Sequence, residues 1–196
     1  MVTRFIALFW MFFFVACGSG GGVNKEALME PNSDEINVEA PKEFLVTFET
    51  TAGNFEIMIY REWAPRGADR FYNLVKNGYY NEQRFFRVVP NFVIQWGLSG
   101  DPEITKQWIN ENILDDPVRE SNTRGRITFA KSNQPNSRTV QVFINLGDNA
   151  RLDDMGFAPF GEVTNGMDTI DTINAEYGEQ PVQGYIANHG NSYLAE

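Results

Sequence analysis

The stretch Phe85-Phe86-Arg87-Val88-Val89-Pro90-Asn91-Phe92-Val93-Ile94-Gln95 holds two short apolar runs separated by Pro90-Asn91. Short runs rich in Val, Ile and Phe and bounded by turn residues are typical of β-strands, so we expect strands at 84–89 and 92–96. Gln95 is a polar side chain within an apolar strand pattern. A buried polar group needs a hydrogen-bond partner, and the stretch therefore predicts two strands and a glutamine held by a specific contact.

Outward from this stretch, the pattern predicts a mainly β fold. Apolar residues alternate with other residues over 44–48 and 55–59, on either side of the turn Thr51-Ala52-Gly53-Asn54, as in a β-hairpin. Helices are expected from Pro65 to Asn77 and from Met167 to Tyr177, each followed by a glycine. Many short strands with two helices indicate a closed or nearly closed antiparallel barrel with helical plugs. The remaining strands are expected at 127–130, 140–146 and 160–164.

The opening stretch resembles the signature of the cyclophilin-type peptidyl-prolyl cis-trans isomerases, and three further segments follow in that family's order. The resemblance covers about residues 44–177 and implies a closed eight-stranded antiparallel β-barrel capped by two α-helices. It also implies an enzyme that isomerises X-Pro bonds and needs no cofactor. The three segments are Arg124-Gly125-Arg126-Ile127-Thr128-Phe129-Ala130, then Ser137 through Gln141-Val142-Phe143-Ile144, then Leu152-Asp153 with Pro159-Phe160-Gly161-Glu162-Val163 and Gly166-Met167-Asp168.

The resemblance also implies roles for individual residues. Arg87 stands at the catalytic position, where the family places a guanidinium beside the prolyl nitrogen. The apolar slot for the proline ring is implied to comprise Phe92, Val93, Phe143 and Leu152. Taken singly, Arg87 could be a surface ion-pair residue and the apolar side chains ordinary core. The other substrate-binding positions implied are Gln95, Ala130, Lys131, Gln141 and Phe157.

Several positions depart from the family pattern. Arg151 stands where many members carry Trp, so strong cyclosporin binding is not expected. Phe157 stands where His or Tyr is frequent. Residues 98–123 lack the family's Gly-rich loop and carry Asp115-Asp116-Pro117, which we interpret as a loop that alters the rim of the groove. Two alternatives to an active isomerase therefore stay open: a cyclophilin-fold module that binds or scaffolds prolyl peptides with little turnover, and an unrelated ligand-binding barrel.

The amino terminus predicts export. Arg4 precedes an unbroken apolar run at 5–15, which is too short to span a bilayer but suits a signal peptide over residues 1–16. Phe14-Val15-Ala16-Cys17 resembles a bacterial lipobox and implies cleavage before Cys17 and lipidation of Cys17; an incidental cysteine after a plain signal is the alternative. Residues 17–42 are then expected to be the lipidated cysteine and a flexible tether to an isomerase domain at 43–196. The expected location is the bacterial cell envelope, on a membrane and facing the periplasm or the exterior.

Composition limits the partners. The chain has 196 residues, 26 acidic against 16 basic, and a net charge of −10, so it repels phosphate backbones and no nucleic-acid partner is expected. Proline-containing polypeptides are the expected substrates, and a monomer is expected because no long unpaired apolar strand stands out. The single cysteine excludes an intramolecular disulfide. Asp115-Asp116 and Asp153-Asp154 lack metal-ligand spacing and are interpreted as solvated loop acids, and His189 as a surface or helix-end residue.

Overall fold

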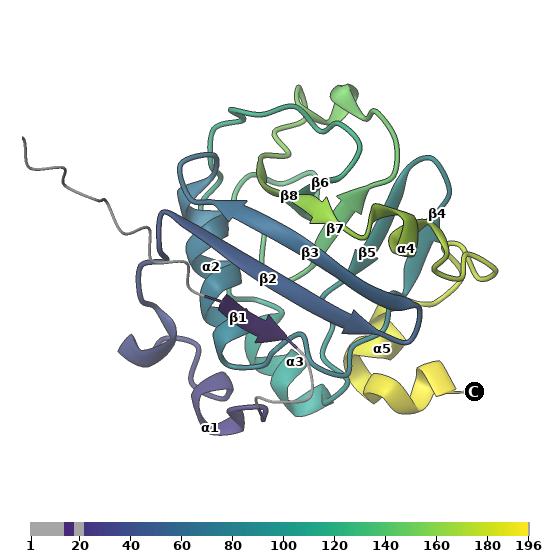
Figure 1. Ribbon diagram of the computed structural model, residues 1–196. Coiled ribbons are helices and arrows are strands. Elements are labelled where there is room, and N and C mark those ends of the chain that lie inside the picture. The colour runs from purple at the N-terminus through teal and green to yellow at the C-terminus, as the bar shows by residue number, and fades with distance from the viewer. Residues whose placement is uncertain (1–13, 18–21, 196) are drawn as a thin grey trace, which may run out of the picture.

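The computed structural model describes residues 14–17 and 22–195, with side chains from residue 22 onward. Within these ranges, eight strands form one sheet in the order β1-β2-β3-β8-β6-β7-β5-β4 (Figure 1). The seven strands from β2 onward pair antiparallel, whereas β1 lies parallel to β2. The strands are β1 (Phe14–Cys17), β2 (Glu43–Thr50), β3 (Gly53–Tyr60), β4 (Arg87–Val89), β5 (Val93–Trp96), β6 (Arg126–Phe129), β7 (Val142–Asn145) and β8 (Pro159–Asn165).

The sheet is open, in contrast to the closed eight-stranded antiparallel barrel that the resemblance implies. Among the described residues, no pairing joins β4 back to β2. The outer edge of β4 is instead met by a loop, because the Val88 backbone N–H donates to the Gly178 carbonyl over 3.0 Å. The carboxy-terminal tail forms the helices α5 (Gln183–His189) and η3 (Gly190–Ala195), so it adds no further strand.

The first expected helix is confirmed as α2 (Pro65–Lys76), which lies behind the β2–β3 hairpin in Figure 1. Its buried stripe includes Ala68, Phe71, Leu74 and Val75. The second expected helix is much shorter than predicted: α4 (Met167–Asp171) stops six residues before Tyr177. The Asn174 side chain accepts a hydrogen bond from the Glu176 backbone N–H over 2.8 Å, and such a local bond favours a turn over a continued helix.

The alternating residues of β2 and β3 pack into the core as predicted. Phe48 stacks on Phe55 with ring centroids 5.0 Å apart, and Phe71 of α2 meets Phe160 of β8 at 5.1 Å. Large buried aromatic side chains dominate this core, and such side chains contribute most to the burial of apolar surface. These aromatic side chains stabilise one face of the sheet. The opposite face is available for the functional residues.

The segment expected to be a flexible tether is packed against the domain over residues 24–40. Its short helices α1 (Lys25–Leu28) and η1 (Asp34–Ile36) bury Leu28 at 0% exposure and Ile36 at 2%. The indole N–H of Trp108 donates to the Leu28 carbonyl over 2.8 Å. The ammonium of Lys25 pairs with Asp101 at 2.6 Å and holds the pKa of that carboxyl below its usual value. In the structure this segment is thus packed where a flexible tether was expected, because a few separated apolar side chains suffice to anchor it.

Trp108 belongs to a further helix inside the region interpreted as a loop. This helix, α3 (Pro102–Trp108), begins with Asp101 as N-cap, whose side chain accepts from the Glu103 backbone N–H over 2.9 Å. It packs against α5. The region 98–123 is thus partly helical, and its helix α3 contacts α1 of the amino-terminal segment.

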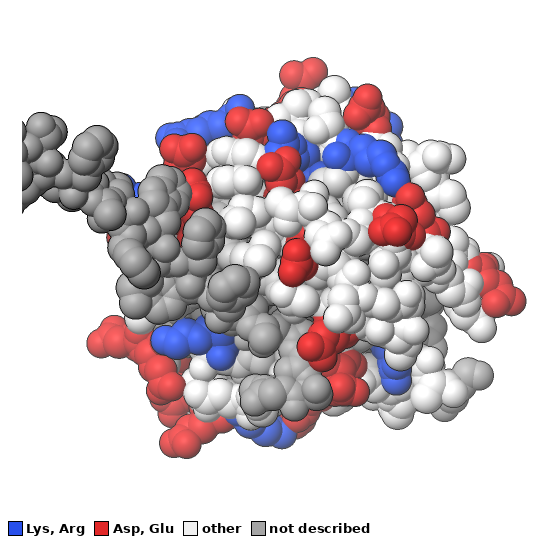
Figure 2. Space-filling view, in the orientation of Figure 1, with Lys and Arg blue, Asp and Glu red and all other residues white. Residues whose placement is uncertain are grey.

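The signal peptide and the lipidated cysteine concern residues that lie mostly outside the described ranges. Residues 14–17 are described as β1, and a chain cleaved before Cys17 would retain only its last residue. No helix within residues 14–17 and 22–195 is long and apolar enough to span a bilayer. On the face shown in Figure 2, acidic side chains are scattered and most basic side chains lie beside acidic ones. Arg126 and Glu162 form one such ion pair in the described part of the chain, at 2.6 Å.

Candidate active site

The β4–β5 hairpin places Arg87 directly opposite Gln95. The turn between the two strands is tight, with Asn91 at φ 60° and the Phe92 N–H donating to the Val89 carbonyl over 3.0 Å. The Arg87 Nη1 group donates to Gln95 Oε1 over 3.2 Å. Local hairpin geometry therefore brings together the arginine and the glutamine that the sequence singled out.

Gln95 is 6% exposed, and both ends of its amide have partners. Its Oε1 accepts from Arg87, and its Nε2 donates to Gln141 Oε1 over 2.8 Å. Gln141 can approach so closely because Gly97, at the end of β5, has no side chain: a Cβ there would lie 2.5 Å from the Gln141 Cα. The predicted partner of Gln95 is thus confirmed, and three polar side chains form one chain of hydrogen bonds.

An apolar cluster lies beside this chain. Val93 of β5, Phe143 of β7 and Leu152 are 1%, 4% and 6% exposed and pack on one another. They form a cluster separate from the main core. The half-buried side chains of Phe92, Ala130 and Phe157 pack against it. Every apolar residue expected around the proline ring is therefore in one place.

Three cations border the apolar cluster. The guanidinium carbon of Arg87 lies 5.3 Å from the ring centroid of Phe92, and that of Arg151 lies 4.7 Å from the same ring. The Lys131 Nζ lies 5.6 Å from the ring of Phe157. Such distances allow attraction between a cation and the face of an aromatic ring. The rim of the cluster therefore carries three cationic side chains, of which Arg87 and Lys131 lie beside the carboxylates of Glu179 and Asp115.

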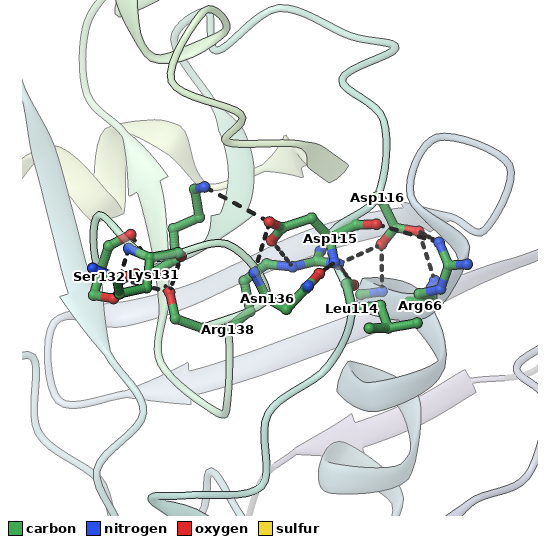
Figure 3. Close-up of polar contacts among 11 residues, drawn as sticks. Arg66, Leu114, Asp115, Asp116, Lys131, Ser132, Asn136 and Arg138 are labelled. Atoms are coloured by element: carbon green, nitrogen blue, oxygen red, sulfur yellow. Dashed lines mark hydrogen bonds and ion pairs between the residues drawn. The ribbon is translucent and has the colours of Figure 1, made fainter.

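Lys131 also belongs to a polar network that reaches the region 98–123 (Figure 3). Its Nζ lies 3.9 Å from Asp115 Oδ2, and Asp115 in turn lies 3.5 Å from the Nε of Arg138. Arg138 and Asp116 form an ion pair at 3.0 Å in which both side chains are 1% exposed. Asp116 accepts from the backbone N–H groups of Arg66 and Gly67 at the start of α2.

Asp116 is therefore a buried helix cap with a buried cationic partner, and the interpretation of Asp115-Asp116 as solvated acids is wrong for it. Sequence reasoning did not identify Arg138 as this partner. Because Arg138 also donates to the Leu114 carbonyl, the network ties region 98–123 to the segment that leads through Gln141 into β7. That region thus supports one wall of the site.

A second network holds the loop that carries Leu152 and Phe157. The carboxylate of Asp153 accepts from Ser121 Oγ over 2.5 Å and from both the backbone and the side-chain nitrogen of Asn122. Asn122 Nδ2 also donates to the Phe157 carbonyl over 2.8 Å. Partial burial by itself raises the pKa of Asp153, but these hydrogen bonds outweigh it and leave the pKa below its ordinary value.

Sequence reasoning missed one acidic residue at the site. Glu179 Oε1 accepts from the Nε of Arg87 over 2.6 Å and also from its Nη2. Glu179 lies 92 positions from Arg87 in the chain and outside the quoted motifs, and no pattern in the sequence indicates this contact.

The other chemical candidates lie elsewhere. A cavity of about 870 Å³ is lined by Phe48, Tyr80, Phe85, Trp96 and Tyr177, among others, but by none of the residues expected to bind substrate. His189 is the last residue of α5, as expected of a helix-end residue. The part of the chain that the structure describes holds no cluster of three potential metal-binding His, Cys, Asp or Glu side chains.

Comparison with known proteins decides the family. The family model described as cyclophilin type peptidyl-prolyl cis-trans isomerase/CLD matches residues 45–189. A peptidyl-prolyl cis-trans isomerase of Acinetobacter baylyi is 38% identical over 148 residues, which cover 70% of this chain and 76% of that protein. The chain belongs to the cyclophilin family.

This cyclophilin is accordingly a peptidyl-prolyl cis-trans isomerase, and its substrates are proline-containing peptides. It is also similar to peptidyl-prolyl cis-trans isomerase B of Escherichia coli, with 34% identity over 137 residues that cover 66% of this chain and 83% of that protein. The crystal structure of a Cryptosporidium parvum cyclophilin type isomerase matches its fold with a TM-score of 0.59 and 21% identity, over 72% of this chain and 90% of that one. The mainly β cyclophilin fold is thereby confirmed.

Proposed function

We propose that this cyclophilin accelerates X-Pro isomerisation in exported or envelope proteins, with Arg87 as the catalytic residue and the Val93–Phe143–Leu152 cluster as the proline pocket. The observation that carries the proposal is the position of Arg87. Its guanidinium is fixed between Gln95 and the ring of Phe92, at the border of a separate apolar cluster. A cation and an apolar slot side by side suit a proline ring and its amide.

The chemistry follows from the amide bond. Rotation about X-Pro has a barrier of about 18–20 kcal/mol, because the nitrogen lone pair is delocalised into the carbonyl. A donor directed at the prolyl nitrogen draws this lone pair out of resonance and stabilises the twisted state more than either planar form. One preorganised donor of this kind is worth about 3–4 kcal/mol. The reaction therefore needs no nucleophile from the protein, only a donor held in a fixed place.

Substrate binding divides between the two halves of the site. The apolar cluster takes the proline ring, while the amide groups of Gln95 and Gln141 lie where they can hydrogen-bond the peptide backbone. Ala130 and Lys131 continue this groove next to Phe157. The exposed guanidinium of Arg151, which lies over the ring of Phe92, favours peptides with an acidic residue near the proline.

The proposal is tested by cis-trans exchange of an Ala-Pro peptide, measured by NMR with the purified full chain. The wild type is expected to accelerate exchange, and Arg87→Ala to lose at least about tenfold of that acceleration. Arg87→Lys is also expected to be poor, because an ammonium lacks the planar fork of donors. Arg84→Ala, at an exposed arginine three residues earlier, is the matched control and is expected to keep wild-type activity.

Two results would contradict the proposal. If the folded wild type shifts the peptide resonances but leaves exchange at its spontaneous rate, the protein is a binder of prolyl peptides. If Arg87→Ala exchanges the peptide as fast as Arg84→Ala, the catalytic assignment is wrong.

We further propose that the enzyme is a monomer held in the bacterial envelope by a lipid on Cys17. The support is the sequence: the apolar run before Ala16 and the position of the single cysteine. Labelled fatty acid is expected to be incorporated into the wild type but not into Cys17→Ser, and only the wild type is expected to fractionate with membranes. Equal fractionation of the two would contradict the anchor.

A further inference from the structure

The segment after α4 crosses the edge of β4 and is pinned there by its backbone. The Val88 N–H donates to the Gly178 carbonyl over 3.0 Å, and the Gly178 N–H donates to the Ala175 carbonyl over 3.1 Å. On the other side of Glu179, the Gln180 N–H donates to the Tyr177 carbonyl over 2.8 Å. The backbone on both sides of Glu179 is thus fixed beside the strand that carries Arg87.

From this position, Glu179 holds one side of the Arg87 guanidinium. Its Oε1 accepts from Nε over 2.6 Å and from Nη2, while Nη1 donates to Gln95. The ring of Phe92 faces the same guanidinium at 5.3 Å. These three contacts come from three different directions, so the plane and the rotation of the guanidinium are both determined.

The count of donors supports a functional arrangement. A guanidinium carries five N–H groups, and the bonds to Glu179 and Gln95 use three of them. Two N–H groups remain for a substrate. That number matches the two acceptors that a prolyl peptide presents at this place, the prolyl nitrogen and a neighbouring carbonyl oxygen.

We propose that Glu179 is a positioning residue of this cyclophilin, which orients Arg87 so that its two free N–H groups face the substrate. The inference rests on the proposed catalytic role of Arg87. It adds a third member, from the chain beyond α4, to the pair of Arg87 and Gln95. Glu179 does not itself touch the substrate in this arrangement; it acts through the arginine.

An ordinary surface ion pair would have a different signature. The Glu179 side chain is 62% exposed and that of Arg87 is 26% exposed, and exposed ion pairs add little to the stability of a fold. Removal of Glu179 should therefore leave thermal unfolding almost unchanged. Its effect should lie in catalysis, since a displacement of a catalytic group by a fraction of an ångström reduces the rate without affecting the fold.

The test compares Glu179→Ala with Glu179→Gln and with the matched control Glu176→Ala in the full chain. Glu176 is an exposed acid in the same segment, three residues earlier. For an Ala-Pro peptide, Glu179→Ala is expected to lower kcat about three- to tenfold with KM almost unchanged, because the oriented arginine acts mainly in the transition state. Glu179→Gln keeps an acceptor oxygen and is expected to retain most of the activity. Glu176→Ala is expected to behave as the wild type.

A double-mutant comparison separates positioning from other roles. In an Arg87→Ala background, Glu179→Ala is expected to cause no further loss, because there is no guanidinium left to orient. An equal loss in both backgrounds would contradict the inference. So would wild-type kinetics of Glu179→Ala, or a gain in activity, which would mean that Glu179 blocks the arginine.

These outcomes are distinct from failure of the proposed function. If the wild type is inactive, or if Arg87→Ala is fully active, the catalytic assignment itself is wrong. If the wild type is active, Arg87→Ala is inactive and Glu179→Ala equals Glu176→Ala, only the role of Glu179 is overturned.

Discussion

Gln141 fixes the orientation of the Gln95 amide. Gln95 Nε2 donates to Gln141 Oε1 over 2.8 Å, so the opposite end of the amide, Oε1, must face Arg87, from which it accepts. If the Gln95 amide turned over, it would present N–H groups to a cation that has only donors. Gln141, which is two hydrogen bonds away from the guanidinium, thus determines that Arg87 faces the carbonyl oxygen of the Gln95 amide.

We therefore predict that Gln141→Ala lowers kcat/KM for an Ala-Pro peptide about tenfold. Loss of the acceptor frees the Gln95 amide and removes a group of the substrate groove. Gln141→Glu keeps an acceptor at this point and should retain more activity than Gln141→Ala. Gln134→Ala, at an exposed glutamine, is the control and should match the wild type. Equal activity of Gln141→Ala and Gln134→Ala would show that the orientation of the Gln95 amide does not affect catalysis.

The parts of the site that could be predicted are those within short sequence patterns. Gln95 stood out because a polar side chain in an apolar strand needs a partner, and the partner exists. Glu179 could not be predicted, because the contact joins residues 92 positions apart and depends on a loop pinned by backbone hydrogen bonds. The same holds for secondary structure. Strands β2 and β3 could be predicted because their apolar residues alternate, whereas the early end of α4 could not, because it depends on a local hydrogen bond of the Asn174 side chain.

A second prediction concerns the apolar pocket. Leu152 is 6% exposed and packs against Val93 and Phe143. Leu152→Ala should raise KM for a prolyl peptide several-fold with a smaller change in kcat, because apolar contact with the ring stabilises the bound ground state and the transition state alike. The truncation should also cost about 2–4 kcal/mol of stability, so activity is to be measured well below the unfolding temperature.

The matched control for the pocket is Leu114→Ala, since the Leu114 side chain is 58% exposed. It should leave both KM and stability within error of the wild type. An unchanged KM in folded Leu152→Ala would mean that the cluster is only a packing core.

A third prediction concerns the buried ion pair. Removal of either Asp116 or Arg138 leaves the partner charged and buried, which costs about 3–5 kcal/mol. Asp116→Ala also removes the acceptor at the start of α2. Both variants should therefore show a much lower urea midpoint. The exposed pair Lys106–Glu103, with both side chains 60% exposed, provides the comparison: Lys106→Ala should cost less than about 1 kcal/mol. Similar losses for the two pairs would contradict the role given to burial.

A fourth prediction is a pH dependence. The pKa of Asp153 lies below its ordinary value of 3.8 in the folded protein, so the carboxylate contributes stability above that value. The contribution is lost as the pH falls through the folded pKa, because the unfolded chain takes up the proton first. Asp153→Asn should lower stability by about 1 kcal/mol at pH 7, since hydrogen bonds to a charged group exceed those to a neutral one by about this amount.

Urea unfolding of the wild type and Asp153→Asn at neutral pH and at a series of pH values below 3.8 measures this difference. It should shrink progressively as the pH falls and the wild-type side chain takes up its proton. A difference that stays constant or grows on acidification would mean that the charge of Asp153 does not stabilise the fold.

A last prediction distinguishes a packed amino-terminal segment from a tether. Leu28 is fully buried and its carbonyl accepts from the indole of Trp108, so the segment contributes both an apolar side chain and a partner for a buried donor. Leu28→Ala should lower the free energy of unfolding by about 2–4 kcal/mol, the cost of a cavity at a buried leucine. Val23→Ala, at a side chain 46% exposed just before α1, should cost almost nothing.

A flexible tether would make both variants neutral. Loss of stability in Leu28→Ala alone would place the start of the folded domain near Asn24, ahead of Glu43, and would leave only six residues between the domain and Cys17. If Cys17 carries the proposed lipid, so short a link would hold the active site near the membrane surface, and inserting flexible residues after Cys17 would extend its reach.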